Sequence, residues 1–336
     1  MFLFPVSVFA QIGGQQTFTF LNLPQQSRLA GLGLVNISSG FKEDATMFVA
    51  NPALLHKDFS GEAAVSYLPL YGNIKHSNLS YVQNFNKAGV FAANLQYVSY
   101  GTFEETDPTG AVIGSFQASE FALGITHART LENYTMGLTA KIAGSQIANV
   151  NAYAVLFDFG TVFKHPTKDL TVALVIKNAG FNLKKYRPDL ESNLPFDVQI
   201  GTSFKPEKMP VRFSITAYKL TRFNIAYDDP TQNLTPDING NLVREEVSFS
   251  DKLFRHFAFG TEFILSKNFN LRAGYNYLVR RELRLQSTSG GAGFSLGFML
   301  KVKAFSFAYS RAWYHVAGAA NSLTLITDTK SFIKKK

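Results

Sequence analysis

The feature of this sequence that most constrains its fold is a two-residue alternation between large apolar side chains and small or polar ones. Phe257, Phe259, Phe263 and Leu265 share one parity, and the residues between them are mostly small or polar. Because successive side chains of a strand point to opposite faces, each such stretch forms a ribbon with one apolar face. Stretches of roughly ten residues with this pattern are typical of strands that cross a bilayer. The sequence therefore predicts an all-β fold: a transmembrane, antiparallel, up-and-down β-barrel.

Composition agrees with this interpretation. Charged residues make up 17% of the 336 residues, which is below the roughly 25% of ordinary soluble domains. No apolar run approaches the roughly 20 residues of a membrane helix. The sequence has 0 Cys, so it contains no disulfide framework and no thiolate chemistry. The net charge of +9 is spread over turns and loops, and this argues against a nucleic-acid partner.

The expected domain organisation has four parts. Residues 1–10 are short and apolar and end in Val8-Phe9-Ala10 before Gln11, which fits the end of a signal peptide, although a basic leader segment is missing. Residues 11–60 form a periplasmic or plug segment, 61–327 the barrel, and 328–336 a C-terminal tail. An exported chain with this alternation is expected in the outer membrane of the cell.

The alternation predicts about fourteen strands, and an even number is usual for bacterial barrels. The expected strands are 61–69, 77–85, 88–100, 115–129, 133–144, 152–165, 169–178, 196–205, 210–218, 255–267, 269–279, 290–302, 303–311 and 319–327. Connections after even-numbered strands are short, and several of those after odd-numbered strands are long (101–114, 179–195, 219–254, 280–289 and 312–318). Short periplasmic turns opposite long external loops are a property of outer-membrane barrels, and a soluble sandwich has no reason to show it.

The segment before the first strand has a different pattern, with a helix-like run from Asp44 to Lys57 that is interrupted at Asn51-Pro52. Asp44 is a candidate helix cap, and Pro52 suits the start of a second turn. Such a segment is well placed to fill the lumen. Lumen-facing glycines either let it approach the wall or serve strand bending and barrel closure; they are Gly124, Gly137, Gly160, Gly201, Gly260, Gly274, Gly293 and Gly297.

Three runs near the N-terminus, 13–24, 27–33 and 51–55, resemble the start of the PorQ family of the type IX secretion system of Bacteroidetes. That family is similar to PorV and, more distantly, to the fatty-acid transporter FadL, a fourteen-stranded barrel with an N-terminal hatch. The resemblance implies an attachment complex at the cell surface, in which the barrel anchors a PorZ-like surface protein near the sortase PorU and PorV. That complex removes a sorting signal from secreted cargo and joins the cargo to lipopolysaccharide.

Catalytic motifs are missing from the sequence, and no cofactor or metal site is expected. The six His residues form no H-x-x-x-H pair, and there is no G-x-S-x-G motif. Barrel lipases carry their Ser and His on the outer wall, whereas His127 and His256 are assigned here to the inward parity. We therefore expect a non-enzymatic protein.

Two external loops are the candidate binding surfaces. In the long loop 221–254, the candidate residues are Tyr227, Asp228, Asp229, Val243, Val247 and Phe249, the last three in an alternating run that suits a hairpin open to strand addition. In loop 179–195, Lys184, Lys185, Tyr186 and Arg187 supply basic charge for an acidic partner or lipopolysaccharide phosphates. The alternative interpretation of both loops is a solvated, mobile surface that binds no partner.

Two functions remain open at this point. The leading one is a membrane anchor whose external loops bind a surface protein. The alternative is a FadL-type transporter of hydrophobic small molecules, which needs an apolar pocket in the lumen. The inward residues argue against that pocket because most are small or polar; they include Asn94, Gln96, Glu120, Lys141, Asp158, Gln199, Arg212 and Arg272.

Overall fold

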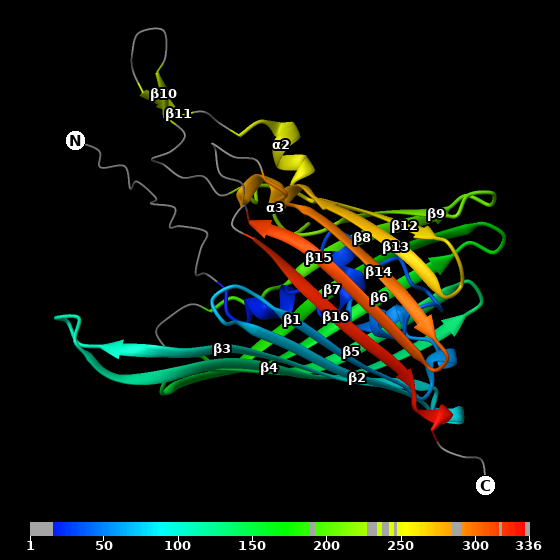
Figure 1. Ribbon diagram of the computed structural model, residues 1–336, viewed down its shortest axis with the longest axis horizontal. Coiled ribbons are helices and arrows are strands. Elements are labelled where there is room, and N and C mark those ends of the chain that lie inside the picture. Colours follow the sequence, from blue (N-terminus) through cyan, green and yellow to red (C-terminus); the bar gives the residue numbers. More distant parts are fainter. Residues whose placement is uncertain are drawn as a thin grey trace, which may run out of the picture.

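The computed structural model describes residues 16–187, 192–226, 247–283, 290–315 and 318–332, and the backbone of 234–236 and 242–244. Fourteen antiparallel strands form a closed barrel, as the alternation predicts (Figure 1). The strands are β1 (Glu62–Pro69), β2 (Lys75–Asn84), β3 (Val90–Thr106), β4 (Val112–Leu131), β5 (Tyr134–Ile147), β6 (Val150–Lys164), β7 (Asp169–Lys184), β8 (Asp197–Lys205), β9 (Val211–Ala217), β12 (Phe257–Ile264), β13 (Phe269–Asn276), β14 (Phe294–Val302), β15 (Phe305–His315) and β16 (Gly318–Asp328). The expected signal peptide lies outside the described residues.

The barrel closes where β1 pairs with β16, in a register that runs from Glu62 opposite Asp328 to Tyr67 opposite Leu323. Every wall strand therefore has two hydrogen-bonded neighbours. Closure matters because an unpaired backbone amide or carbonyl in lipid costs several kcal/mol, and a closed barrel has no unpaired edge within the membrane.

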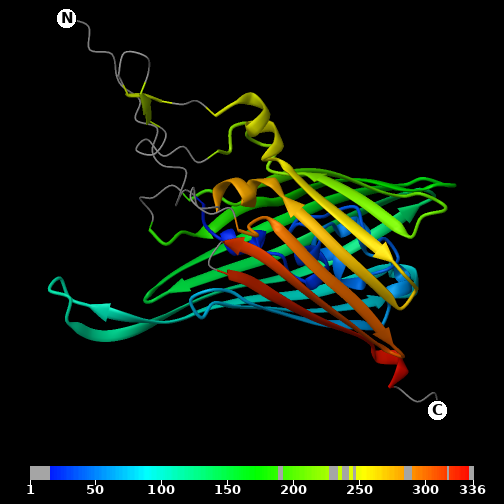
Figure 2. The ribbon, with the colours of Figure 1, turned by 45° about the horizontal axis from the view of Figure 1, so that its top comes forward.

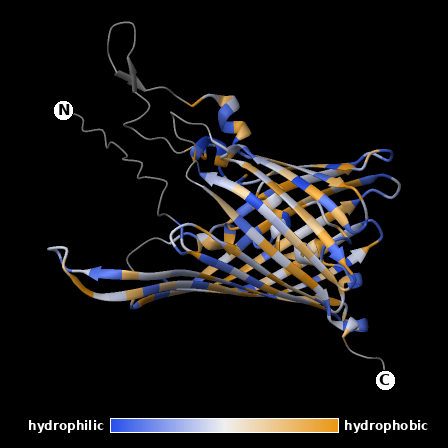
Figure 3. Cartoon of the chain, viewed as in Figure 1, coloured by the Kyte–Doolittle hydropathy of each residue, from blue (hydrophilic) through white to orange (hydrophobic). Residues whose placement is uncertain are grey.

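The outer face of the wall is apolar, and Figure 3 shows orange bands around the barrel. Outward side chains such as Leu123, Ile125, Leu138 and Leu296 are about half exposed, while the alternate residues are buried inside. A broad exposed apolar surface of this kind is unstable in water and suits a bilayer. Among the described residues, no helix has the length and hydropathy to cross a membrane. The protein is an outer-membrane β-barrel, and the predicted location is confirmed.

The two ends of the barrel differ. At one end, here the turn end, strands are joined by short connections such as 132–133, 165–168 and 303–304. At the other, the loop end, lie the described parts of three longer connections: 185–187 and 192–196, 218–226 and 247–256, and 277–283 and 290–293. Since outer-membrane barrels have short periplasmic turns and long external loops, the loop end faces outward.

Several of the predicted loop boundaries are wrong. Residues 101–114 were expected to form a loop, but β3 and β4 extend through most of this range and leave only 107–111 as a turn. Figures 1 and 2 show this hairpin projecting well beyond the neighbouring strands. We call residues 102–117 the arm. Similarly, β7 extends to Lys184 and β15 to His315, so the predicted loops 179–195 and 312–318 both begin as strand.

Inside the barrel, the described part of the N-terminal segment (16–61) forms short helical turns (blue in Figure 1): η1 (Thr19–Asn22), α1 (Ser27–Gly31), η2 (Ala45–Val49), η3 (Pro52–Leu54) and η4 (Lys57–Phe59). We call residues 16–60 the plug. Asp44 accepts a hydrogen bond from the Thr46 amide and starts η2. Asn51 caps η3 in the same way, with Pro52 at its first position. The Asp44 cap and the position of Pro52 at the start of the second turn agree with the prediction, although the turns are 3₁₀ rather than α-helical.

The plug runs the length of the lumen. Gln16 forms a β-bridge with Asn193 in the β7–β8 connection at the loop end. At the other extreme, the Gly61 carbonyl accepts a hydrogen bond from the Thr329 amide, beside the turn end of β16. The segment therefore enters the described structure at the outer mouth and reaches the first strand at the periplasmic side.

Candidate functional site

Polar wall residues hold the plug through its backbone. Ser310 Oγ donates to the Ser27 carbonyl at 2.6 Å, and Asn276 Nδ2 donates to the Gly33 carbonyl at 2.9 Å. Gln96 Nε2 donates to the Phe20 carbonyl at 3.0 Å. These bonds satisfy backbone groups that irregular turns leave free. Some of the small and polar inward residues, such as Ser310, Asn276 and Gln96, are therefore hydrogen-bond partners of the plug.

Five of the eight predicted lumen glycines make room for the plug. A Cβ on Gly137 would lie 2.4 Å from the Pro52 carbonyl carbon, and one on Gly274 would lie 2.0 Å from the Gly33 amide nitrogen. Gly160, Gly201 and Gly260 similarly face Asn51, Ile37 and Leu32. The remaining three, Gly124, Gly293 and Gly297, have other wall or loop residues as their nearest neighbours. Close approach of the plug therefore explains most, but not all, of these glycines.

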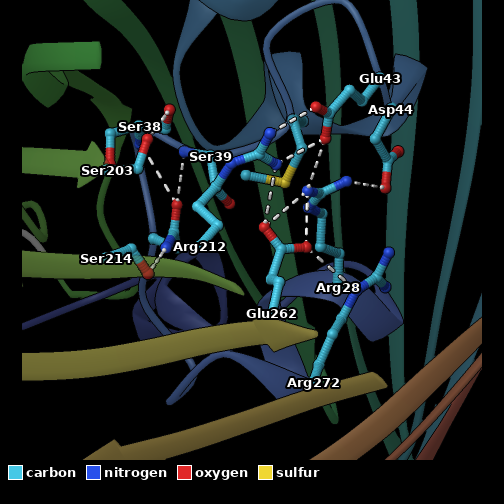
Figure 4. A network of polar contacts seen from close by, with 12 residues as sticks. Arg28, Ser38, Ser39, Glu43, Asp44, Ser203, Arg212, Ser214, Glu262 and Arg272 are labelled. Atoms are coloured by element: carbon cyan, nitrogen blue, oxygen red, sulfur yellow. Dashed lines mark hydrogen bonds and ion pairs between the residues drawn. The ribbon is translucent and has the colours of Figure 1, made fainter. Parts of the chain in front are cut away.

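A network of charges joins the plug to the wall in the lumen (Figure 4). Glu262 of β12 accepts both hydrogen bonds, at 2.6 and 2.9 Å, from one guanidinium nitrogen of the plug's Arg28. Arg212 of β9 pairs with Glu43 of the plug and lies 3.4 Å from Glu262. Arg272 of β13 approaches the same carboxylate at 3.4 Å. The buried side chain of Glu262 is thus shared by three arginines.

Glu43 lies on the plug turn that faces Arg212. Burial alone would raise the pKa of its carboxyl, but hydrogen bonds and the positive charge of Arg212 and Arg28 outweigh this and hold the pKa at about 2. Glu43 is therefore ionised at neutral pH and adds an attractive contact between plug and wall. Two ion pairs thus cross between plug and wall, Arg28 with Glu262 and Arg212 with Glu43, and we call this network the lock.

Above the lock, a cavity of about 430 Å³ lies between the plug and the wall near the loop end. Its apolar lining comes mainly from the plug and the external segments: Leu21, Leu23, Leu29, Leu34, Val35, Ile37, Phe196, Ile225, Leu278 and Val279. Lys177, Lys219 and Arg222 contribute cationic groups to its lining, and Asp197 contributes a carboxyl group. A space of this size is within the range of small-molecule sites. The prediction that the lumen lacks an apolar pocket is therefore wrong, because the plug supplies apolar side chains that the wall does not.

A second hollow, of about 490 Å³, lies at the outer rim between the arm and the β7–β8 connection. Phe103 and Phe116 line it from the arm, and their rings stack with centroids 5.4 Å apart. The opposite side carries Lys185, Tyr186 and Arg187, three of the predicted binding residues. The fourth, Lys184, is the exposed last residue of β7. The structure therefore brings this predicted cluster together around a concave site.

The predicted residues of the long loop are placed differently. Tyr227, Asp228 and Asp229 lie outside the described residues. Val243 belongs to a short hairpin formed by β10 (Leu234–Pro236) and β11 (Leu242–Arg244), in which it pairs with Thr235. The predicted strand does not continue through Val247 to Phe249, because Ser248 caps a helix that begins at Phe249.

That helix, α2 (Phe249–Phe254), is tied to α3 (Tyr277–Glu282) by a cluster that the sequence did not indicate. Asp251 accepts a hydrogen bond from Arg255 at 2.8 Å and from the Tyr277 hydroxyl at 2.8 Å, and it pairs with Arg281 at 2.6 Å. Burial would raise the pKa of Asp251, but these hydrogen bonds and charges hold it below its usual range. These contacts hold the two helices together beside the outer mouth, and we call the pair the α2–α3 platform.

One of the two parity assignments made for histidines is wrong. His127 lies on the outer wall, where its ring packs 4.5 Å from Phe91 and Nδ1 contacts the Val90 carbonyl. His256 is buried, as predicted, and both ring nitrogens contact carbonyls, those of Tyr218 and Phe223. Within the described residues there is no group of three or more His, Asp or Glu side chains suited to a metal ion.

Comparison with known proteins supports the fold. The sequence matches no protein-family model and no curated protein sequence. A mutant of the monoaromatic hydrocarbon channel TodX is similar in structure, with a TM-score of 0.51 and 10% identity over 90% of this chain and 97% of that one. A FadL homologue from Pseudomonas aeruginosa gives a TM-score of 0.46 and 12% identity, over 91% and 98% of the two chains. At 10% identity, the likeness to the TodX mutant supports the barrel fold alone.

Proposed function

We propose that this protein is a non-enzymatic outer-membrane anchor of a type IX secretion attachment complex. It holds a PorZ-like surface protein at the loop end, near a PorU-type sortase and PorV, where cargo is joined to lipopolysaccharide. The N-terminal runs that resemble the PorQ family supply the identity of this complex. The observation that carries an anchoring role is the plug, which is fixed along the lumen by backbone hydrogen bonds and by the Arg28–Glu262 pair.

A plugged barrel suits anchoring because its interior stays rigid while its outer surface is free to bind. The wall strands bury their backbone groups in one another and so hold the molecule in the bilayer. The loop end carries the arm, the β10–β11 hairpin and the α2–α3 platform, which together form an extensive external surface (Figure 2). Lys184, Lys185 and Arg187 add positive charge that suits lipopolysaccharide phosphates.

Affinity purification tests this function. The full-length tagged barrel, extracted in mild detergent, is expected to retain a large soluble surface protein at near-equal stoichiometry. Deletion of 221–254 should reduce that retention, because it removes most of the external surface between β9 and β12. Recovery of the barrel without any surface protein, from cells in which secretion is active, would count against the anchor.

A second function, binding or transport of hydrophobic small molecules, is favoured by the 430 Å³ cavity. Its lining combines apolar side chains with the charged groups of Lys177, Asp197, Lys219 and Arg222, which suits a molecule with an apolar body and a polar head. The plug lies between this cavity and the turn end, so passage across the membrane requires the plug to move.

Mass spectrometry of solvent extracts tests the second function. The wild-type barrel should yield a stoichiometric apolar molecule, and Ile225→Trp, which fills part of the cavity, should lose it. Phe249→Trp, on the exposed start of α2, serves as the control. Equal extracts from the wild type and Ile225→Trp would show that the cavity holds no specific ligand.

A further inference from the structure

The arm rises above the part of the barrel that lipid can cover. β3 has 17 residues and β4 has 20, whereas roughly 9–11 residues cross the bilayer. Counted from Val90, the membrane-spanning part of β3 ends near Tyr100. The six residues that follow extend roughly 20 Å farther along the strand. Whatever contacts the arm therefore lies outside the membrane.

Within the described structure, both backbone edges of the arm are unpaired, except at its base, where the Gln117 carbonyl accepts a hydrogen bond from the Ala148 amide. Pairing of β2 with β3 stops at Lys75 opposite Ser99, and pairing of β4 with β5 stops at Ile147 opposite Ala118. Beyond these points, residues 102–106 pair only with 112–117. An isolated two-stranded hairpin is marginally stable in water, and its free edges are templates for a further strand.

The side chains of the arm also favour a partner. Val112 and Ile113 are 60% and 64% exposed, and Phe103 is 44% exposed. Proteins often protect such edges with lysine, and the arm contains none. Its turn is nevertheless well formed, because the Asp107 carboxylate accepts hydrogen bonds from the amides of Thr109 and Ala111. The arm is thus ordered up to its tip while its apolar side chains stay exposed.

The charge of the arm indicates what kind of partner it binds. Glu104, Glu105 and Asp107 are its charged residues, and it has no Lys, Arg or His, although the whole chain carries a net charge of +9. Successive residues of a strand point to opposite faces, so Glu104 and Glu105 place a carboxylate on each face of β3. A strand added beside β3 would meet one of these carboxylates on either face, and basic side chains there are stabilising cross-strand neighbours.

We infer that the free edge of β3 in the arm is the docking site for the surface partner, which adds an edge strand bearing basic side chains. This inference rests on the proposed anchoring function and identifies the element that carries it. Strand addition supplies main-chain hydrogen bonds, and the carboxylates of Glu104 and Glu105 select the partner's charge.

A charge-reversal experiment with the purified proteins tests this inference. The probe is the surface protein recovered with the wild-type barrel. Double substitution Glu104→Lys with Glu105→Lys is expected to weaken binding at least tenfold. Glu132→Lys is the matched control, because Glu132 is an exposed acid on the β4–β5 turn at the opposite end. A photo-crosslinking residue at Thr106 should label the partner, and the same residue at Tyr134 should not.

The outcomes separate the inference from the function on which it rests. If the wild type binds the partner and the double variant binds within twofold, the arm is not the docking site, although the anchor function stands. If the double variant instead loses self-association of the barrel, the arm is an interface between two copies and the inference is wrong. If the wild type binds no surface protein, the function and the inference both fail.

Discussion

At the scale of single residues, the lock in the lumen depends on an uneven balance of charge. Glu262 is 2% exposed and has Arg28, Arg212 and Arg272 around it. Arg28 makes the strong hydrogen bonds, while the guanidinium nitrogens of Arg272 donate none within the described residues. A buried cation without hydrogen bonds is costly. Substitution of Glu262 should therefore destabilise the protein, whereas substitution of Arg272 should not.

We predict that Glu262→Gln loosens the plug. The substitution leaves three buried guanidinium groups around a neutral amide, and breaking a buried ion pair typically costs about 3–5 kcal/mol. The temperature at which the barrel unfolds in detergent should fall, and ion conductance through reconstituted barrels should rise. Arg272→Met should leave both properties unchanged or raise the unfolding temperature. If Arg272→Met lowers the unfolding temperature as much as Glu262→Gln does, the guanidinium of Arg272 must make stabilising hydrogen bonds, and the prediction is wrong.

A pH dependence follows from Glu43. The pKa of its carboxyl is about 2 when the plug is docked, below the usual 4.5. Its contribution to the stability of the docked plug is therefore complete above about pH 4.5 and is lost as the pH falls toward 2. Conductance should therefore rise between pH 4.5 and 2, and Glu43→Gln should remove this part of the pH response. A wild-type response confined to pH values above 5 would contradict the assignment.

At the scale of elements, alternation located all fourteen wall strands because each must turn an apolar face to lipid. It did not reveal the arm, because Thr102 to Thr106 and Gly114 to Gln117 lie above the bilayer and need no apolar face. Residues such as Thr, Glu and Gly in that range are typical of a loop. Pairing between the strands, which the pattern of one strand does not encode, keeps them extended.

The plug provides a test at the same scale. Gly137→Val should displace η3, because the new side chain would overlap Pro52; overpacking of this kind typically costs about 1–3 kcal/mol. Limited proteolysis should then cut within residues 45–59. Gly114→Val, on the arm, is the control, because its nearest neighbour is the flexible side chain of Glu105. Equal protection of the two variants would mean that η3 can shift without cost.

At the scale of the whole molecule, the apolar outer face holds the barrel in the membrane. Leu296→Arg and Phe259→Arg should each impair assembly, by roughly 2–4 kcal/mol near the bilayer centre. Val112→Arg should not, because Val112 lies on the arm above the lipid. The folded fraction in lipid vesicles, measured by the gel shift of unheated samples, distinguishes these cases. Normal assembly of both wall variants would reverse the assignment of the two faces.

The candidate site was only partly predictable from the sequence, for reasons that belong to the whole molecule. Inward parity correctly identified Arg212 and Arg272. The plug residues of the same network, Glu43 opposite Arg212 and Arg28 opposite Glu262, lie more than a hundred residues away from their partners in sequence. The apolar cavity also depends on where the plug lies, so the wall residues alone suggested a polar lumen. By contrast, Lys185, Tyr186 and Arg187 were found because they are adjacent in sequence.

The path of the plug, from Gln16 at the outer mouth to Gly61 at the turn end, constrains how the molecule is built. The plug is hydrogen-bonded to strands from both ends of the barrel sequence, to β3 through Gln96 and to β15 through Ser310. The strand that follows the plug, β1, is also the strand that seals the cylinder against β16. We therefore expect the wall strands to assemble around the plug, with the pairing of β1 and β16 completed last.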